Sequence, residues 1–163
     1  MNSSRILMTI AFLGVILAFS GCGGSKTAAE TPQDKQFGLL SAKTWKLSSV
    51  TLGGTDQNTS AAWTNFVLTI SGTKGSTSFN YSCAGRPALS PWPASGTWAF
   101  DTNPVTQIIR DQGTANALPI TYSVTAAAGT TAATLQISFS YTGNGYTRVG
   151  NVSGSWVFNF TGN

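Results

Sequence analysis

Apolar and polar side chains alternate along most of the chain beyond residue 44. Between residues 76 and 83, for example, Phe79, Tyr81 and Cys83 are separated by Asn80 and Ser82. Successive side chains of a strand point to opposite faces, so this period of two predicts strands with one apolar and one polar face. We predict eight of them, at residues 44–52, 63–70, 76–83, 96–101, 105–110, 118–124, 133–142 and 151–161.

Short turn signals separate these strands. They include Gly53-Gly54, the run 101–104 (Asp-Thr-Asn-Pro) and the run 143–145 (Gly-Asn-Gly). Connections this short join antiparallel neighbours. We therefore predict an all-β domain folded as an eight-stranded antiparallel up-and-down barrel, which leaves no exposed edge. A two-sheet β-sandwich uses the same pattern and is the alternative. The outward positions carry Ser, Thr, Asn and Gln, which disfavours a transmembrane barrel.

The first 22 residues have the pattern of a bacterial lipoprotein leader. Arg5 precedes an apolar run at 6–19, and Ser20 and Gly21 lead into Cys22. The run is shorter than the roughly 20 residues that a membrane-spanning helix needs. We predict a signal peptide at residues 1–21 and lipidation of Cys22. Residues 22–36, rich in small and polar side chains, are expected to form a flexible tether to a domain at 37–163.

Composition narrows the function. Charged residues make up 9% of the chain, while 23 Thr and 19 Ser supply polar surface. Removing Arg5 with the leader leaves eight basic residues against five acidic ones, without the cluster that a nucleic-acid partner requires. We expect no nucleic-acid binding, a monomer and attachment to the membrane through Cys22.

Catalytic chemistry has few candidate residues. The chain has no histidine, and Asp56, Asp101 and Asp111 each stand in a turn sequence. Cys83 has no partner once Cys22 is lipidated, so we expect it to be a buried, unreactive thiol. We predict no enzymatic activity, no cofactor and no metal site.

Three segments resemble the lipocalin-like lipoproteins of Bacteroidota: residues 39–47 around Thr44-Trp45, residues 92–98, and residues 154–158. The resemblance implies a lipocalin-like barrel and a lipid anchor, in a family whose ligands are largely unassigned. Gly23 after Cys22 is similar to outer-membrane sorting sequences. The stretch 23–26 has no acidic cluster of the kind associated with surface export, which favours the periplasmic face.

Two functions are compatible with these features. In the first, the barrel lumen binds a small hydrophobic or amphipathic ligand, lined by Trp98, Tyr122, Phe139, Trp156 and Phe158; the same aromatics could instead simply fill the core. In the second, the domain is an envelope interaction module that meets a protein or glycan. Arg86 and Trp92 of the proline-rich loop at 85–93 are then the contact residues, although Trp92 could also fold down as a lid.

Overall fold

The computed structural model describes residues 29–58, 61–127, 131–146 and 150–163. The predicted signal peptide at 1–21 and the predicted lipidation site Cys22 lie outside the described residues. The elements in chain order are α1 (Pro32–Ser41), β1 (Thr44–Leu52), β2 (Thr55–Asp56), the 3-10 helix η1 (Ala61–Trp63), β3 (Val67–Ser71), β4 (Phe79–Ala84), β5 (Ser95–Phe100), β6 (Gln107–Arg110), β7 (Leu118–Thr125), β8 (Thr134–Tyr141) and β9 (Gly154–Gly162).

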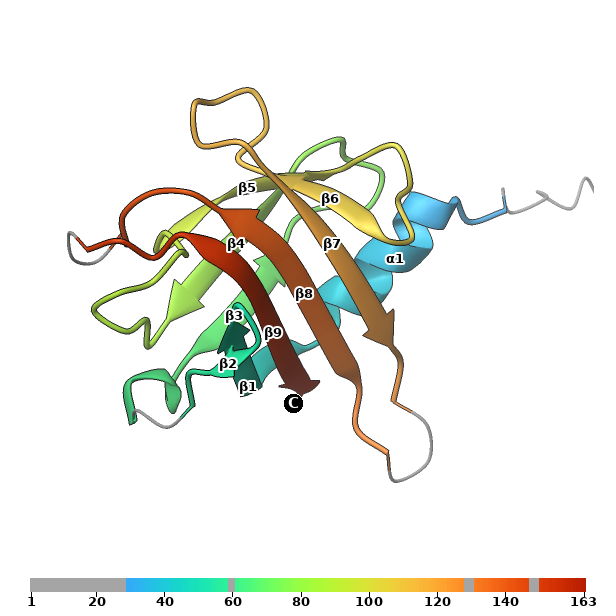
Figure 1. Ribbon diagram of the computed structural model, residues 1–163. Coiled ribbons are helices and arrows are strands. Elements are labelled where there is room, and N and C mark those ends of the chain that lie inside the picture. The colour runs from blue at the N-terminus through green and yellow to red at the C-terminus, as the bar shows by residue number, and fades with distance from the viewer. Residues whose placement is uncertain (1–28, 59–60, 128–130, 147–149) are drawn as a thin grey trace, which may run out of the picture.

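The strands form a closed antiparallel barrel (Figure 1). Each of β3 to β8 pairs with the next strand in sequence, and β1 pairs with both β3 and β9. The β1–β9 ladder runs from Trp45 opposite Gly162 to Leu52 opposite Trp156, so the sheet has no open side. The short β2 folds back on the end of β1. The predicted eight-stranded barrel is confirmed, and this continuous closure excludes the β-sandwich.

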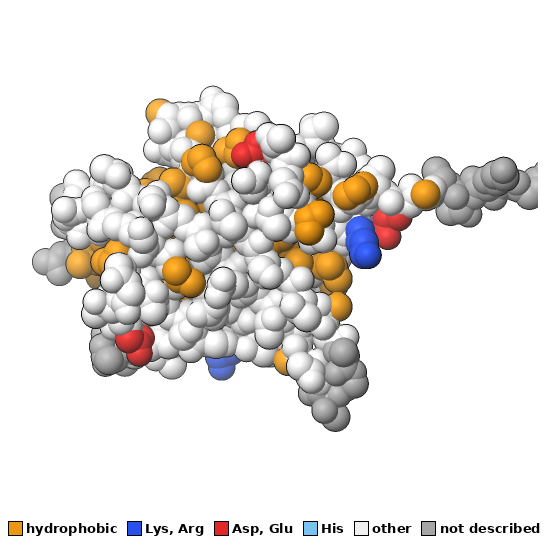
Figure 2. Space-filling model, turned by 45° about the vertical axis from the view of Figure 1, so that its right-hand side comes forward, with side chains coloured by type: hydrophobic (Ala, Val, Ile, Leu, Met, Phe, Trp, Pro, Cys, Tyr) orange, Lys and Arg blue, Asp and Glu red, His pale blue; other side chains and the backbone are white. Residues whose placement is uncertain are grey.

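Burial follows the alternation that the sequence predicts. In β4, Phe79, Tyr81 and Cys83 are buried, whereas Asn80 and Ser82 are exposed. The outer surface therefore carries mostly hydroxyl and amide side chains. Figure 2 shows one face on which charged side chains are few.

Five strands are shorter than predicted, and in two of them a turn or a helix takes the first residues. Residues 103–106 form a hydrogen-bonded turn, in which the Gln107 amide donates to the Asn103 carbonyl at 2.8 Å, so β6 begins at Gln107. At 63–70, Trp63 belongs to η1 and the strand begins only at Val67.

The predicted tether is partly wrong, because α1 occupies residues that we assigned to it. Thr31 caps this helix by accepting the Asp34 amide at 3.1 Å, and Pro32 begins it. Phe37 and Leu40, three residues apart, are buried against the barrel. The ordered domain thus includes α1.

Each end of the barrel is closed differently. The helix end holds α1 with the β3–β4 and β5–β6 turns. There Phe37 stacks on Phe79 with ring centroids 4.5 Å apart, and the Trp45 indole donates to the Leu40 carbonyl at 2.7 Å. The Tyr122 hydroxyl donates to the Pro104 carbonyl in the β5–β6 turn. The opposite end, called the loop end, holds η1 and the connections at 85–94, 111–117 and 142–153 (Figure 1).

Gly85 fixes the start of the loop at 85–94. Its φ is +63°, and a Cβ there would overlap the Asn65 carbonyl oxygen. Gly113, with φ of +79°, has nothing within 4 Å of a Cβ and is a matched control for backbone strain. We expect Gly85→Ala to lower the free energy of unfolding by about 2 kcal/mol more than Gly113→Ala does, because only the first forces backbone atoms apart. Urea denaturation measures both variants, and equal losses would contradict this close approach.

Candidate functional site at the loop end

The five predicted ligand-binding aromatics all lie inside the barrel, each at most 6% exposed. They fall into two groups. Phe139 and Trp156 flank Phe158 near the loop end, each with its ring centroid 5.7 Å from that of Phe158. Trp98 and Tyr122 lie toward the helix end, where Trp98 stacks on Phe79 at 4.6 Å and Tyr122 reaches the β5–β6 turn. They do not form a single ligand wall.

The structure corrects the placement of Trp92. We predicted a contact residue, with a ring folded down as a lid as the alternative. Trp92 is 2% exposed and its ring projects into the loop end of the barrel, as in the alternative. Burying so large an apolar ring is favourable, and Pro91 and Pro87 in the same loop are buried with it. The Trp92 centroid lies between 5.5 and 6.5 Å from the ring centroids of Phe66, Tyr81, Phe139 and Phe158. Trp92 thus fills space among the aromatics that line this end.

Residues 85–93, here called the closing loop, carry Trp92 inward. Within the loop, the Trp92 amide donates to Ser90 Oγ at 3.1 Å, and Arg86 Nη1 donates to the Trp92 carbonyl at 3.0 Å. Two hydrogen bonds reach the loop from elsewhere in the described chain, both 2.9 Å long. The Tyr146 amide donates to the Ser90 carbonyl, and Arg110 Nη1 donates to the Pro91 carbonyl.

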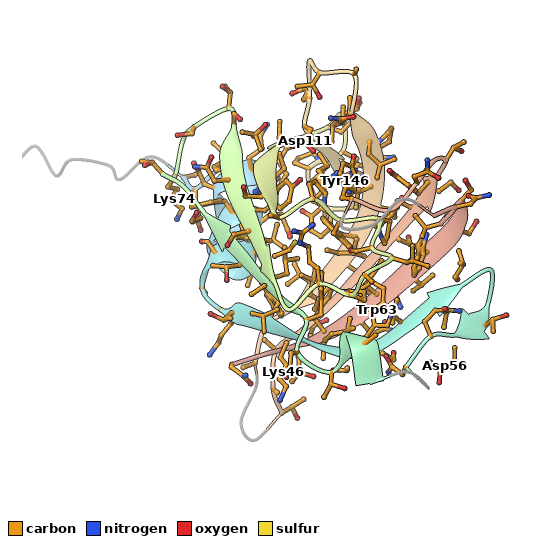
Figure 3. The ribbon with its side chains drawn as sticks, turned by 90° about the vertical axis from the view of Figure 1, so that its left-hand side faces the viewer. Lys46, Asp56, Trp63, Lys74, Asp111 and Tyr146 are labelled. Atoms are coloured by element: carbon orange, nitrogen blue, oxygen red, sulfur yellow. The ribbon has the colours of Figure 1, made fainter. Side chains whose placement is uncertain are left out.

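Arg110, the last residue of β6, is the buried cation of this site at 1% exposure. Its Cζ lies 5.3 Å from the Trp92 ring centroid and 5.6 Å from that of Tyr146. Its Nε is 3.4 Å from Asp111 Oδ2, and its Nη2 is 3.4 Å from the Tyr146 hydroxyl. Figure 3 views the loop end and shows Asp111 beside Tyr146, with Trp63 farther away toward Asp56.

Asp111 is confirmed as a turn residue, with φ of +52°, but its carboxylate does more than shape the turn. Oδ1 accepts the Thr97 amide at 3.0 Å, and Oδ2 accepts the Tyr81 hydroxyl at 3.1 Å. Burial raises the pKa of Tyr81, so this hydroxyl stays protonated and can donate. The carboxylate therefore holds Tyr81 and β5 in place beside Arg110.

Several polar atoms at this end lack partners. Arg110 Nε and Trp92 Nε1 are buried without a hydrogen bond in the described part of the chain. Trp98 Nε1, nearer the helix end, is likewise buried and lacks a hydrogen bond to any described residue. Leaving a buried donor unsatisfied costs roughly 1–3 kcal/mol, and more for a charged group. The loop end is thus short of hydrogen-bond acceptors.

Sequence reasoning did not single out Arg110, although a signal was present. The alternation in β6 places Arg110 on the same face as buried Ile108. The side chain of Arg110 is therefore expected to point into the barrel. Arg86, the other predicted contact residue, lies in the closing loop. It is partly exposed and donates to the Trp92 carbonyl of the same loop. Cys83 is confirmed as a buried thiol, and burial raises its pKa to about 12.

Shallow grooves of about 370 and 390 Å³ lie on the outer surface along β7 to β9. The lining of the first mixes polar and apolar residues, and that of the second is mainly Ser, Thr, Gln and Asn. Among the described residues, no three His, Cys, Asp or Glu side chains gather as metal ligands would. Nor does that part of the chain contain a helix long and apolar enough to cross a membrane.

Comparison with known proteins adds no assignment. No protein-family model matches the chain. Searches of curated proteins and of solved structures also find no significant match. A function is therefore inferred from the geometry of the loop end and from the predicted leader at residues 1–21.

Proposed function

We propose that this chain is a membrane-anchored lipoprotein whose barrel takes up a small hydrophobic or amphipathic molecule through the loop end. The ligand occupies the space that Trp92 fills in the closed state. The observation that carries the proposal is the contrast between the two ends. A docked helix closes one. At the other, Trp63 of η1 packs against Phe158, and the Trp92 ring lies beside it on a loop that two hydrogen bonds hold from outside.

The surroundings of Trp92 suit such a ligand. Phe66, Phe139 and Phe158 surround its ring with apolar surface and stay in place on η1–β3, β8 and β9 when the loop moves. Most of the interaction between the closing loop and the barrel is therefore apolar contact, which an alkyl chain can replace. Each CH₂ group that a ligand buries there contributes about 0.8 kcal/mol.

The proposed anchor orients the barrel. Lys74 in the β3–β4 turn forms an ion pair with Glu30, and the Gly75 amide donates to Asp34 at 2.9 Å. These contacts fix the chain from Glu30 onward at the helix end. Only residues 23–29 then separate the domain from Cys22, a span of at most about 25 Å. The helix end would face the membrane, which we propose to be the periplasmic face of the outer membrane. The loop end would point away from it.

A second function is favoured by the filling of the interior in the closed state. A barrel packed with aromatic rings works equally well as a rigid interaction module at the envelope. Its contact surface would be the outside of the loop end, where Arg86 is partly exposed and Leu89 and Tyr146 are exposed. Ligand titration separates the two functions.

The lipid anchor is tested by metabolic labelling. In bacteria fed labelled palmitate, we expect the wild-type chain to become labelled and to lose residues 1–21, because the leader directs acylation of Cys22. Cys22→Ser should abolish both events. Cys83→Ser removes the other cysteine of the chain and should leave labelling intact. Label entering the Cys22→Ser protein would contradict the anchor.

Ligand uptake is tested by calorimetric titration with decan-1-ol and decanoate. Trp92→Ala removes the side chain that competes with the ligand, so we expect either compound to bind this variant at least about tenfold more tightly than wild type. The reason is that the apparent dissociation constant equals the intrinsic constant divided by the fraction of open molecules. The variant should also be less stable by about 3–5 kcal/mol, and ligand should restore part of that loss.

Trp45→Ala is the matched control for this titration, because Trp45 is a fully buried tryptophan at the helix end. It should lower stability without tightening binding. If neither compound bound wild type or Trp92→Ala, lumenal uptake would be refuted and the interaction module favoured. Weaker binding to Trp92→Ala would show that Trp92 is part of the ligand wall rather than its competitor.

A further inference from the structure

The bonding of Arg110 is unusual for so deeply buried a cation. Its one short hydrogen bond, at 2.9 Å, goes to the Pro91 carbonyl of the closing loop itself. Its contacts with Asp111 and Tyr146 are both 3.4 Å long, and Nε has no hydrogen-bond partner in the described chain. Buried guanidinium groups are normally matched to carboxylates through two parallel short bonds. Arg110 thus has unused capacity to bind an anion.

Opening the closing loop increases this capacity. The Pro91 carbonyl and the Trp92 ring belong to the loop, so both leave Arg110 when the loop moves out. Asp111 does not move with the loop, but its two oxygens already accept hydrogen bonds from Thr97 and Tyr81. An open barrel therefore presents a guanidinium that lacks a short hydrogen bond, and leaving it so is costly.

The charges that stay in place when the loop opens indicate the ligand's charge. Arg86 belongs to the closing loop and leaves with it, whereas Arg110 and Asp111 remain on the barrel. Once the Pro91 carbonyl has left, Arg110 can donate hydrogen bonds to one carboxylate. A second negative charge on the ligand would lie close to Asp111 without a further cation. The site fits a monoanion.

We infer that Arg110 is the head-group receptor of the barrel and that the ligand is an aliphatic monocarboxylate. Its carboxylate takes the place of the Pro91 carbonyl on Arg110, and its chain takes the place of the Trp92 ring against Phe66, Phe139 and Phe158. This inference rests on the proposed uptake of a ligand at the loop end. It adds the chemical class of that ligand and the residue that selects it.

The test compares three ten-carbon compounds that differ in head group: decanoate, decan-1-ol and decyltrimethylammonium. Wild type should bind decanoate at least about tenfold more tightly than decan-1-ol, because hydrogen bonds to charged groups are the stronger ones. It should not bind the cation measurably. Arg110→Gln should bind decanoate and decan-1-ol alike. Arg110→Lys, which keeps the charge but not the planar fork, should show a smaller preference than wild type.

Lys46→Gln removes one positive charge from the exposed outer face of β1 and should leave the preference for decanoate unchanged. The inference is overturned if wild type binds decanoate and decan-1-ol equally, which leaves ligand uptake itself standing. It is also overturned if the preference survives in Arg110→Gln. If none of the three compounds binds, both the inference and the proposed uptake fail. Should Arg110→Gln not fold, the wild-type comparison of the three head groups decides by itself.

Discussion

A guanidinium buried at one end of the barrel is the constraint on which the rest of this structure depends. Arg110 cannot be left unsolvated without partners, and the carbonyl of Pro91 is the acceptor that it reaches at short distance. That bond, with the Trp92 ring lying over the guanidinium, draws a proline-rich loop into the barrel. A polar group thereby determines how the apolar interior is closed.

The two ends of the barrel consequently have different physical character. At the helix end, Phe37, Leu40 and the Trp45 indole join α1 to the barrel through stacking, burial and a hydrogen bond. At the loop end, Trp63 of η1 and the Trp92 ring close the barrel, and two hydrogen bonds reach the closing loop from outside it. Elements with few attachments open more readily than the core that supports them. This asymmetry places the proposed entrance at the loop end and the proposed anchor at the other.

The alternation of apolar and polar residues predicted the barrel, because one face of each strand has to be apolar to cover the core. Closure follows because the two edge strands of an open sheet would leave unpaired backbone groups. The N-terminal helix was missed because only Phe37 and Leu40 are buried in it, although Thr31-Pro32 was a visible start signal. The inward position of Trp92 was predicted only as an alternative, because Arg110, which holds the loop in place, lies on a different strand. The inward position of Arg110 could be predicted, because it lies two residues from Ile108 on the same strand. It was missed because a charged residue is not ordinarily assigned to a core.

The proposed uptake requires that the closing loop opens without unfolding of the barrel. Hydrogen exchange of the tryptophan indole N–H groups, followed by NMR, tests this most directly. Trp45 Nε1 donates to the Leu40 carbonyl at the helix end, whereas Trp92 Nε1 lies on the closing loop and has no hydrogen-bond partner among the described residues. We predict that the Trp92 indole exchanges by local opening, at a free energy several kcal/mol below that of Trp45 and insensitive to low denaturant. Equal protection of the two, lost only in global unfolding, would contradict the account.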